Sequence, residues 1–358
     1  MNKKLIWSVI VAIIAIVLIT GVSNNKSVTD NGRIRIGVIV PLSGPAAAFG
    51  LPTQRAVDLA MSHLSDDVRS KIEIVYGDDQ LDTKQTVSVT QKLIDTDKVS
   101  AIVAWSSPTA VAASYVAERS GIPMVGLGNS PEINTNKQWV LRYMLGPVPQ
   151  ARAIVDLLLK GKYKKVAIMW NQSDGPKSVH DELVKILPAE GFTVVADESV
   201  MKGENDFKTS ISKLRAAKPE VVIAYISPQV GIFAKQAKDL RLDTPLVSGP
   251  PFEIIEQVKA AQGGIDNQLF VGADNIAFMD EFYAKYSSYP TIAGDYMADA
   301  ITQLATALSS GQTGQDLVRS IKKDFSGVAG AYKYNGDGSF DVKQVVKKWD
   351  GIKFVVVN

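Results

Sequence analysis

One short segment of the sequence has residue types that suit the binding of an anion. Trp105-Ser106-Ser107-Pro108-Thr109 follows an apolar run typical of a strand and precedes a helical pattern. Serine is favoured at the N-cap and proline at the first helical position, so Ser107 and Pro108 fit those two places. The unpaired N–H groups and the positive end of the helix dipole would then attract a carboxylate. The alternative is that Ser107 only caps its own helix.

A second loop of small, hydrogen-bonding residues follows the next predicted strand. It consists of Gly126-Leu127-Gly128-Asn129-Ser130-Pro131-Glu132. Gly128, Asn129 and Ser130 are candidates for contacts with the same ligand. A Gly-Asn-Ser-Pro run is also typical of an ordinary surface turn, so both interpretations stay open.

Aromatic residues stand beside several predicted strand ends. A cleft with aromatic walls is one interpretation, since small-molecule pockets commonly have them; the other is that each ring belongs to the core. Trp105 is the best wall candidate because it adjoins the anion-binding turn. The complete set of predicted ligand-binding residues is Ser107, Ser106, Trp105, Thr109, Gly128, Asn129, Ser130, Phe49, Ser227 and Phe252.

No combination of residues indicates catalysis. His63 and His180 have no neighbours at metal-ligand spacing, and Asp78-Asp79 better suits a turn before a helix. The sequence lacks a Gly-x-Gly-x-x-Gly motif after its first strand, and it has no phosphate-binding loop. With 0 cysteines, thiolate chemistry and disulfides are excluded. We therefore expect no catalytic residues, no metal and no cofactor, and the chain is not expected to be an enzyme.

The elements that must position these residues alternate between strand and helix. This alternation predicts an α/β fold with parallel sheets and helices on both faces. Gly146-Pro147-Val148-Pro149 interrupts the pattern and separates two half-domains of similar rhythm. The predicted strands are 36–40, 72–76, 101–104, 123–125, 165–170, 193–200, 221–225 and 246–248, and a hairpin is predicted between 331–334 and 342–349.

Composition and charge agree with a globular chain that does not bind nucleic acid. Of 358 residues, 46% are apolar and 21% are charged, and the net charge is +2. Lys3, Lys4 and Lys26 against Asp30 account for that charge, so the rest of the chain is formally neutral. A neutral domain has no electrostatic footprint for nucleic acid.

The N-terminal segment indicates export. Lys3-Lys4 precedes an almost unbroken apolar run, Leu5 to Val22. Its length lies between a signal-peptide core and a spanning helix, and Val22 stands where a lipoprotein would carry its cysteine. We favour an uncleaved helix that anchors an extracytoplasmic domain to the membrane, followed by a polar tether; a cleaved signal peptide is the alternative.

Several short motifs follow one another along the chain in a specific order. They are Arg33 to Pro45, Tyr76 to Gln85, Asp206-Phe207, Lys218 to Val222, Lys235 to Lys238, Phe325 to Gly330 and Asn335 to Gly338. In this order the chain resembles the leucine-binding-type periplasmic binding proteins that serve branched-chain amino-acid importers. The resemblance covers nearly everything after residue 32.

This resemblance implies the type I periplasmic-binding-protein fold, with two doubly wound α/β lobes, three crossovers and a ligand cleft between the lobes. It implies residues 1–32 as signal or anchor and tether, 33–146 plus about 274–328 as lobe 1, and 147–273 plus about 329–358 as lobe 2. The expected function is capture of a small carboxylated solute by hinge closure and its delivery to the permease of an ABC transporter. A ligand sensor of the same fold, acting through a partner, is the alternative.

The resemblance also carries residue roles, with departures. Ser107 matches the family's serine that holds the ligand's α-carboxylate. Where leucine-type binders have a glutamate for the ligand's ammonium, this chain has Pro251, within Gly249-Pro250-Pro251-Phe252-Glu253. Phe49 replaces a frequent tyrosine. Either Glu253 takes over the missing role or the ligand lacks an α-ammonium.

Overall fold

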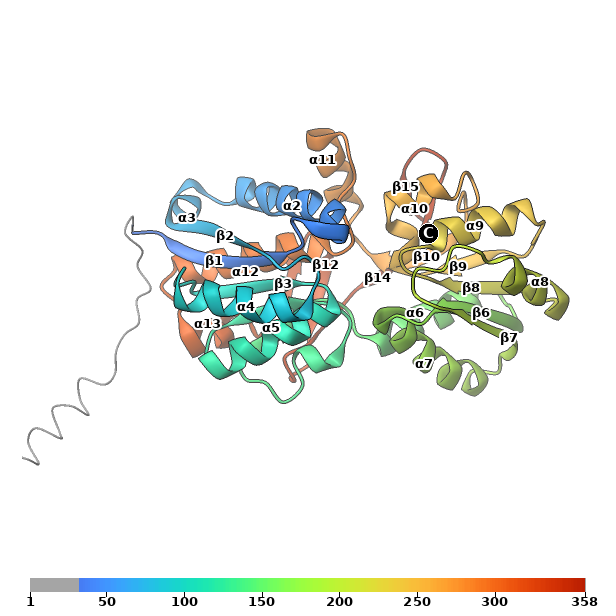
Figure 1. Cartoon of the computed structure of the whole chain (residues 1–358), viewed down its shortest axis with the longest axis horizontal. Helices are drawn as coiled ribbons and strands as arrows, with labels where there is room; N and C mark the ends of the chain where they lie inside the picture. Colours follow the sequence, from blue (N-terminus) through green and yellow to red (C-terminus); the bar gives the residue numbers. More distant parts are fainter. Residues whose placement is uncertain (1–31, 358) are drawn as a thin grey trace, which may run out of the picture.

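The computed structural model describes residues 32–357 of the chain, which form two lobes side by side (Figure 1). The predicted anchor and most of the tether lie outside the described residues. Within residues 32–357, no helix is both long and apolar enough to cross a bilayer.

The first lobe is built on a parallel sheet with the strand order β2-β1-β3-β4-β5. Side chains of α2, α12 and α13 pack on one face of this sheet, and those of α4 and α5 pack on the other. Its elements are β1 (Ile34–Val40), η1 (Gly44–Phe49), α2 (Gly50–His63), α3 (Asp66–Lys71), β2 (Ile72–Asp78), α4 (Thr83–Asp95), β3 (Ala101–Trp105), α5 (Ser107–Ser120), β4 (Met124–Leu127), η2 (Pro131–Ile133), β5 (Val140–Arg142), α12 (Gly294–Ser309) and α13 (Gly314–Ile321).

Strand β1 shows why an unbroken apolar run is needed in such a sheet. Ile36 and Val38 belong to the cluster under α2 and α12, whereas Ile39 belongs to the cluster under α4 and α5. Neighbouring residues of a strand point to opposite faces, and both faces are covered by helices. A polar residue on either side would therefore be buried.

The second lobe has a sheet of strand order β15-β14-β10-β9-β8-β6-β7, in which β14 is antiparallel to both of its neighbours. Helices α6 and α7 cover one face, and α8, α9 and α10 cover the other. Its elements are α6 (Pro147–Lys160), β6 (Lys165–Asn171), α7 (Asp174–Ala189), β7 (Thr193–Val200), α8 (Lys208–Ala217), β8 (Val221–Tyr225), α9 (Val230–Asp239), β9 (Leu246–Ser248), η3 (Pro250–Glu253), α10 (Ile255–Ala260), β10 (Leu269–Ala273), β14 (Gln344–Trp349) and β15 (Phe354–Val356).

The chain passes between the lobes where the sheets exchange strands. It passes first between β5 and α6, at the Gly146 to Pro149 segment that interrupts the sequence pattern. It passes again after β10, where α11 (Ile276–Tyr286) contributes side chains to the cores of both lobes. It passes a third time into β14, which crosses the space between the lobes (Figure 1).

The third crossover differs from the predicted one. Strands β11 (Phe325–Gly327), β12 (Gly330–Tyr334) and β13 (Phe340–Val342) form a separate antiparallel sheet, and Tyr332 and Phe340 are buried in the core of the first lobe. Residues 329–342, predicted for lobe 2, therefore pack with lobe 1. The reason is aromatic packing, because Phe325, Tyr332 and Phe340 surround the buried ring of Tyr143.

The predicted C-terminal hairpin is wrong in its second strand. Asn335 to Gly338 do form a turn, but the turn joins β12 to the short β13. Residues 344–349 form β14, which pairs with β10 and β15. The segment from 342 to 349 is thus divided between two sheets at Lys343.

Candidate functional site

A cavity with a volume of about 790 Å³ lies between the two lobes. The loops at the carboxyl ends of β1, β3, β4, β6, β8 and β9 contribute to its walls. In open α/β sheets this edge is where ligand crevices form. Of the predicted residues, Phe49, Trp105, Ser106, Ser107, Gly128, Asn129 and Ser227 line it.

The start of α5 is positioned differently from the prediction. Ser106, not Ser107, is the N-cap, and its side chain makes no cap hydrogen bond. Ser107 is the first helical residue, so the alternative that it merely caps its helix is wrong. The backbone of Ser106 has φ 76° and ψ 145°, a strained conformation for a residue with a side chain, and such strain concentrates at functional sites.

The N-terminal turn of α5 therefore faces the cavity with amide groups that the helix itself does not pair. Pro108 has no N–H, so the donors of this turn are those of Ser107 and Thr109. Together with the positive end of a 14-residue helix, they suit a carboxylate.

The hydroxyl of Ser107 binds the second predicted loop. The backbone N–H of Asn129 donates to Ser107 Oγ over 3.0 Å, and the Ser107 hydroxyl donates to the side-chain oxygen Oδ1 of Asn129 over 3.0 Å. A Cβ on Gly128 would lie only 2.7 Å from Ser107 Cα. The two loops are therefore in backbone contact, which only glycine at position 128 permits without a shift.

Asn129 also reaches across to the second lobe. Its Nδ2 lies 3.4 Å from the carbonyl oxygen of Gly175 and 3.4 Å from Ser178 Oγ, both in the first turns of α7. These are long hydrogen bonds. They place the anion-binding turn directly at the interface between the lobes.

Two aromatic rings form a wall in the first lobe. Phe49 and Trp105 have ring centroids 5.2 Å apart. Trp105 is oriented by its indole N–H, which donates to the carbonyl oxygen of Ile292 over 2.9 Å. The ring thus presents its apolar body to the cavity while its polar atom is satisfied.

Three predicted residues do not line the cavity. Phe252 is fully buried against Phe270 in the core of the second lobe. The side chain of Thr109 is buried and its hydroxyl donates to the Trp105 carbonyl. Ser130 does not line the cavity, and its backbone amide lies 3.4 Å from Ser107 Oγ.

Comparison with known proteins identifies the family. Residues 33–343 match the periplasmic binding protein family. The chain belongs to this family. A Leu/Ile/Val-binding protein homolog 1 of Brucella suis biovar 1 (strain 1330) is 25% identical over 336 residues, covering 88% of this chain and 90% of that protein.

Solved structures confirm the type I fold of this periplasmic binding protein. The branched-chain amino acid transporter substrate-binding protein LivJ of Streptococcus pneumoniae str. Canada MDR_19A, in complex with isoleucine, has a TM-score of 0.79 at 24% identity, covering 91% of this chain and 99% of that one. A solute-binding protein of an ABC transporter from R. palustris, in complex with benzoate, has a TM-score of 0.79 at 20% identity, covering 91% and 96%. The relatives are solute-binding proteins and not enzymes.

Charge is scarce in the cavity of this periplasmic binding protein. Among the described residues that line it, Asp174 and Lys202 alone carry formal charge, and both are exposed. They follow the neighbouring strands β6 and β7, so the two opposite charges share one rim. The interior walls are uncharged.

Glu253, the predicted substitute for the missing acid, is engaged elsewhere. It forms an ion pair with Lys347, whose side chain is 0% exposed. Lys347 Nζ also donates to the Ala273 carbonyl over 2.8 Å and to Asn275 Oδ1 over 2.9 Å. Asn275 in turn donates to Asp295 over 2.8 Å. We call Glu253, Lys347, Asn275 and Asp295 the crossover network.

The crossover network connects the two lobes where the chain passes between them. Lys347 is on β14, Asn275 follows β10, and Asp295 begins α12 of the first lobe. Burial and the charge of Glu253 raise the pKa of Asp295 to about 7. The network thus holds a carboxyl that titrates near neutral pH.

Several lining residues were not predicted. The sequence could have indicated five of them, because each lies at or just after the end of a strand or in the first turn of a helix: Gln150, Ser173, Tyr225, Pro250 and Pro251. Gln150 and Tyr225 hydrogen-bond to each other. Ile292 and Ala293 follow no strand. They reach the cavity because α12 packs across the first sheet, and no local pattern indicates this.

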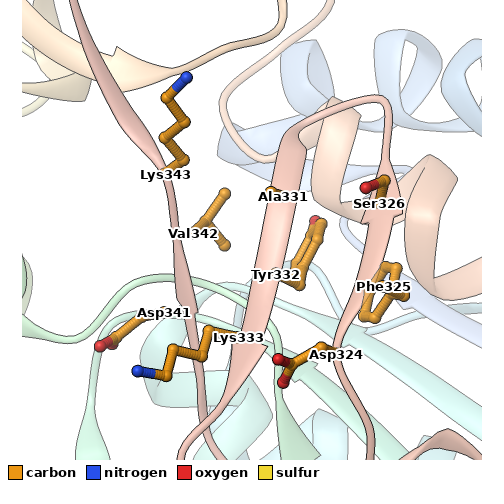
Figure 2. A pocket seen from close by; sticks show the side chains of 9 residues that line it. All are labelled: Asp324, Phe325, Ser326, Ala331, Tyr332, Lys333, Asp341, Val342 and Lys343. Carbon is orange, nitrogen blue, oxygen red and sulfur yellow. The ribbon is translucent and has the colours of Figure 1, made fainter.

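A second hollow lies on the small sheet and is unrelated to the cleft. Figure 2 shows its lining, in which the charged side chains of Asp324, Lys333 and Asp341 lie below the rings of Phe325 and Tyr332 in this view. All of its residues come from one sheet of one lobe, so closure of the lobes would not enclose a ligand there.

The histidines and acids of the described residues form no metal site. No group of three or more potential ligands is close enough within residues 32–357. His63 pairs with Glu281 over 2.7 Å, and His180 stacks on Trp170 and contacts Asp197 over 2.9 Å. Both histidines are tied to structural partners.

Proposed function

We propose that this periplasmic binding protein captures a small carboxylated solute between its lobes, closes on it by hinge motion and delivers it to the permease of an ABC transporter. The observation that carries the proposal is the meeting of the α5 N-terminus, Ser107 and Asn129 at the interlobe cavity. A carboxylate at this point would accept hydrogen bonds from preorganised amides and face the second lobe across Asn129.

The ligands of similar structures support the carboxylate. Isoleucine and benzoate, named for two of them, differ in size, shape and charge but share that group. An anion-binding turn in this chain is the feature that would recognise what they have in common.

The test is a thermal-shift screen of the purified chain over branched-chain and aromatic amino acids, aliphatic acids and benzoates, with the matching amides as controls. We expect one or more acids to raise the unfolding temperature and their amides to have no effect. Small-angle scattering should then show a smaller radius of gyration with ligand, because the lobes close. A panel in which amides and acids act alike would contradict the proposal.

We further propose an extracytoplasmic location with attachment through residues 5–22. The support is the family and the apolar N-terminal run. Cell fractionation followed by N-terminal sequencing tests the attachment. A soluble form that begins near Asn24 would show a cleaved signal peptide instead of an anchor.

A further inference from the structure

We infer that the cleft selects monocarboxylates with an uncharged body and discriminates against their α-amino derivatives. This inference rests on the proposed function, because it assumes that the α5 turn holds a carboxylate. It concerns what surrounds the rest of the ligand.

Glu253, two residues after the lining residue Pro251, is unavailable to a ligand. Glu253 ends η3, whose residues Pro250 and Pro251 line the cavity, but its side chain points to β10 and β14. A Cβ on Gly272 of β10 would lie 3.4 Å from Glu253 Oε2 and 2.9 Å from Lys347 Nζ. The carboxylate of Glu253 is thus already paired with the ammonium of Lys347, and neither residue lines the cavity.

The walls that remain carry no charge, and part of each is apolar. Pro251 and Ile254 lie on the side of the second lobe, and Phe49, Trp105 and Ile292 lie on the side of the first. An ammonium enclosed between such walls loses its hydration without gaining a charged partner, which is unfavourable. A methyl group or an aromatic ring gains from the same enclosure.

Asp174 is the one lining carboxylate among the described residues, and it does not supply the charged partner that a ligand's ammonium would need. It is exposed at the rim, which it shares with Lys202 of opposite charge. An ion pair exposed to water contributes little. This is less than the cost of desolvating an ammonium.

The experiment is calorimetry on the purified full-length chain with two matched pairs: leucine against 4-methylpentanoate, and phenylalanine against 3-phenylpropanoate. Each pair differs only by the α-ammonium. We expect that in at least one pair the acid binds, with an affinity at least tenfold higher than that of its amino acid. If every pair that binds shows a ratio below tenfold, the inference is overturned while the proposed function survives. If none of the four binds, the inference is overturned, and the thermal-shift panel of acids and amides decides the proposed function separately.

Two variants of Pro251 test whether the wall at this position causes the discrimination against amino acids. Pro251→Glu places a carboxylate on the cavity wall, and Pro251→Gln is its uncharged match. We expect Pro251→Glu to shift the affinity ratio at least tenfold toward the amino acid relative to Pro251→Gln. Equal ratios in two folded variants would overturn the assignment to this wall. Should either variant fail to fold, the ratios of the unmodified chain decide alone.

Asp174→Asn tests the rim. If this variant weakens amino-acid binding tenfold and leaves the acid unchanged, an ammonium does have a partner in the cleft, and the inference is overturned. A change of less than threefold in the ratio supports it.

Discussion

At the scale of single residues, Ser107 contributes both its backbone and its side chain to the wall of the cavity. Its amide belongs to the first turn of α5, while its hydroxyl fixes Asn129 by two hydrogen bonds of 3.0 Å. The loop that Asn129 occupies faces α7 of the other lobe. A single hydroxyl therefore positions both the anion-binding turn and the contact between the lobes.

We predict that Ser107→Ala weakens binding of the best carboxylate by about 10-fold, the equivalent of about 1.4 kcal/mol, because the loop of Asn129 loses the hydroxyl that holds it beside the first turn of α5. Calorimetry measures the loss. Ser120→Ala, at the exposed far end of the same helix, is the matched control and should bind normally. Unchanged affinity in a folded Ser107→Ala protein would remove Ser107 from the binding site.

At the scale of elements, a buried carboxylate holds the small sheet against the first lobe. Asp299 of α12 accepts hydrogen bonds from the amides of Val328 and Ala329 over 2.7 and 3.0 Å and from the Tyr332 hydroxyl over 2.8 Å. Burial nevertheless raises the pKa of Asp299 to about 6. This contact adds to the aromatic packing around Tyr143 in holding β12 to the first lobe.

We predict that Gly327→Ala destabilises the protein by about 2–5 kcal/mol, because a Cβ there would lie 2.2 Å from Asp299 Oδ1 and would displace the carboxylate from the two amides. Denaturant unfolding measures the loss. Gly336→Ala, in the turn of the same sheet, is the control: its φ is +86° but the added Cβ meets nothing within 4 Å, so it should cost only about 1 kcal/mol. Equal losses in the two variants would contradict the role of Asp299.

At the scale of the whole molecule, the crossover network makes stability depend on pH. The folded-state pKa of Asp295 is raised to about 7 from an ordinary value of 3.8. A raised carboxyl pKa means that the folded state holds the proton more tightly than the unfolded state. The stability this contributes is fully present below about pH 4 and is lost as the pH rises through 7.

We predict that Asp295→Asn removes this dependence. Between pH 4 and pH 8 the unmodified chain should lose up to about 4 kcal/mol of unfolding free energy relative to the variant, since each unit of pKa is worth about 1.4 kcal/mol. Denaturant unfolding at several pH values measures it. Parallel profiles for the two proteins would show that Asp295 is ionised in the folded state throughout this range.

Much of the fold follows from local sequence patterns. Continuous apolar runs such as Ile36 to Val40 and Val221 to Tyr225 predict buried parallel strands, and both are central strands of the two sheets. Small and polar residues directly after such strands indicate a ligand edge, and Ser107 and Asn129 do meet there. These features depend on neighbours in the chain, so the sequence by itself determined them.

The remaining features depend on residues that are distant in the sequence, and only the tertiary structure decided them. Phe252 turned out to be core because Phe270 packs on it, and the third crossover moved because Tyr143 gathers the rings of the small sheet. Glu253 is separated from Lys347 by 94 positions. An ion pair between them has no local signature, yet it decides whether a carboxylate faces the ligand. The sequence thus determined which strand-end loops meet at the cavity between the lobes, whereas the charge around that cavity depends on contacts that form only when the two lobes are assembled.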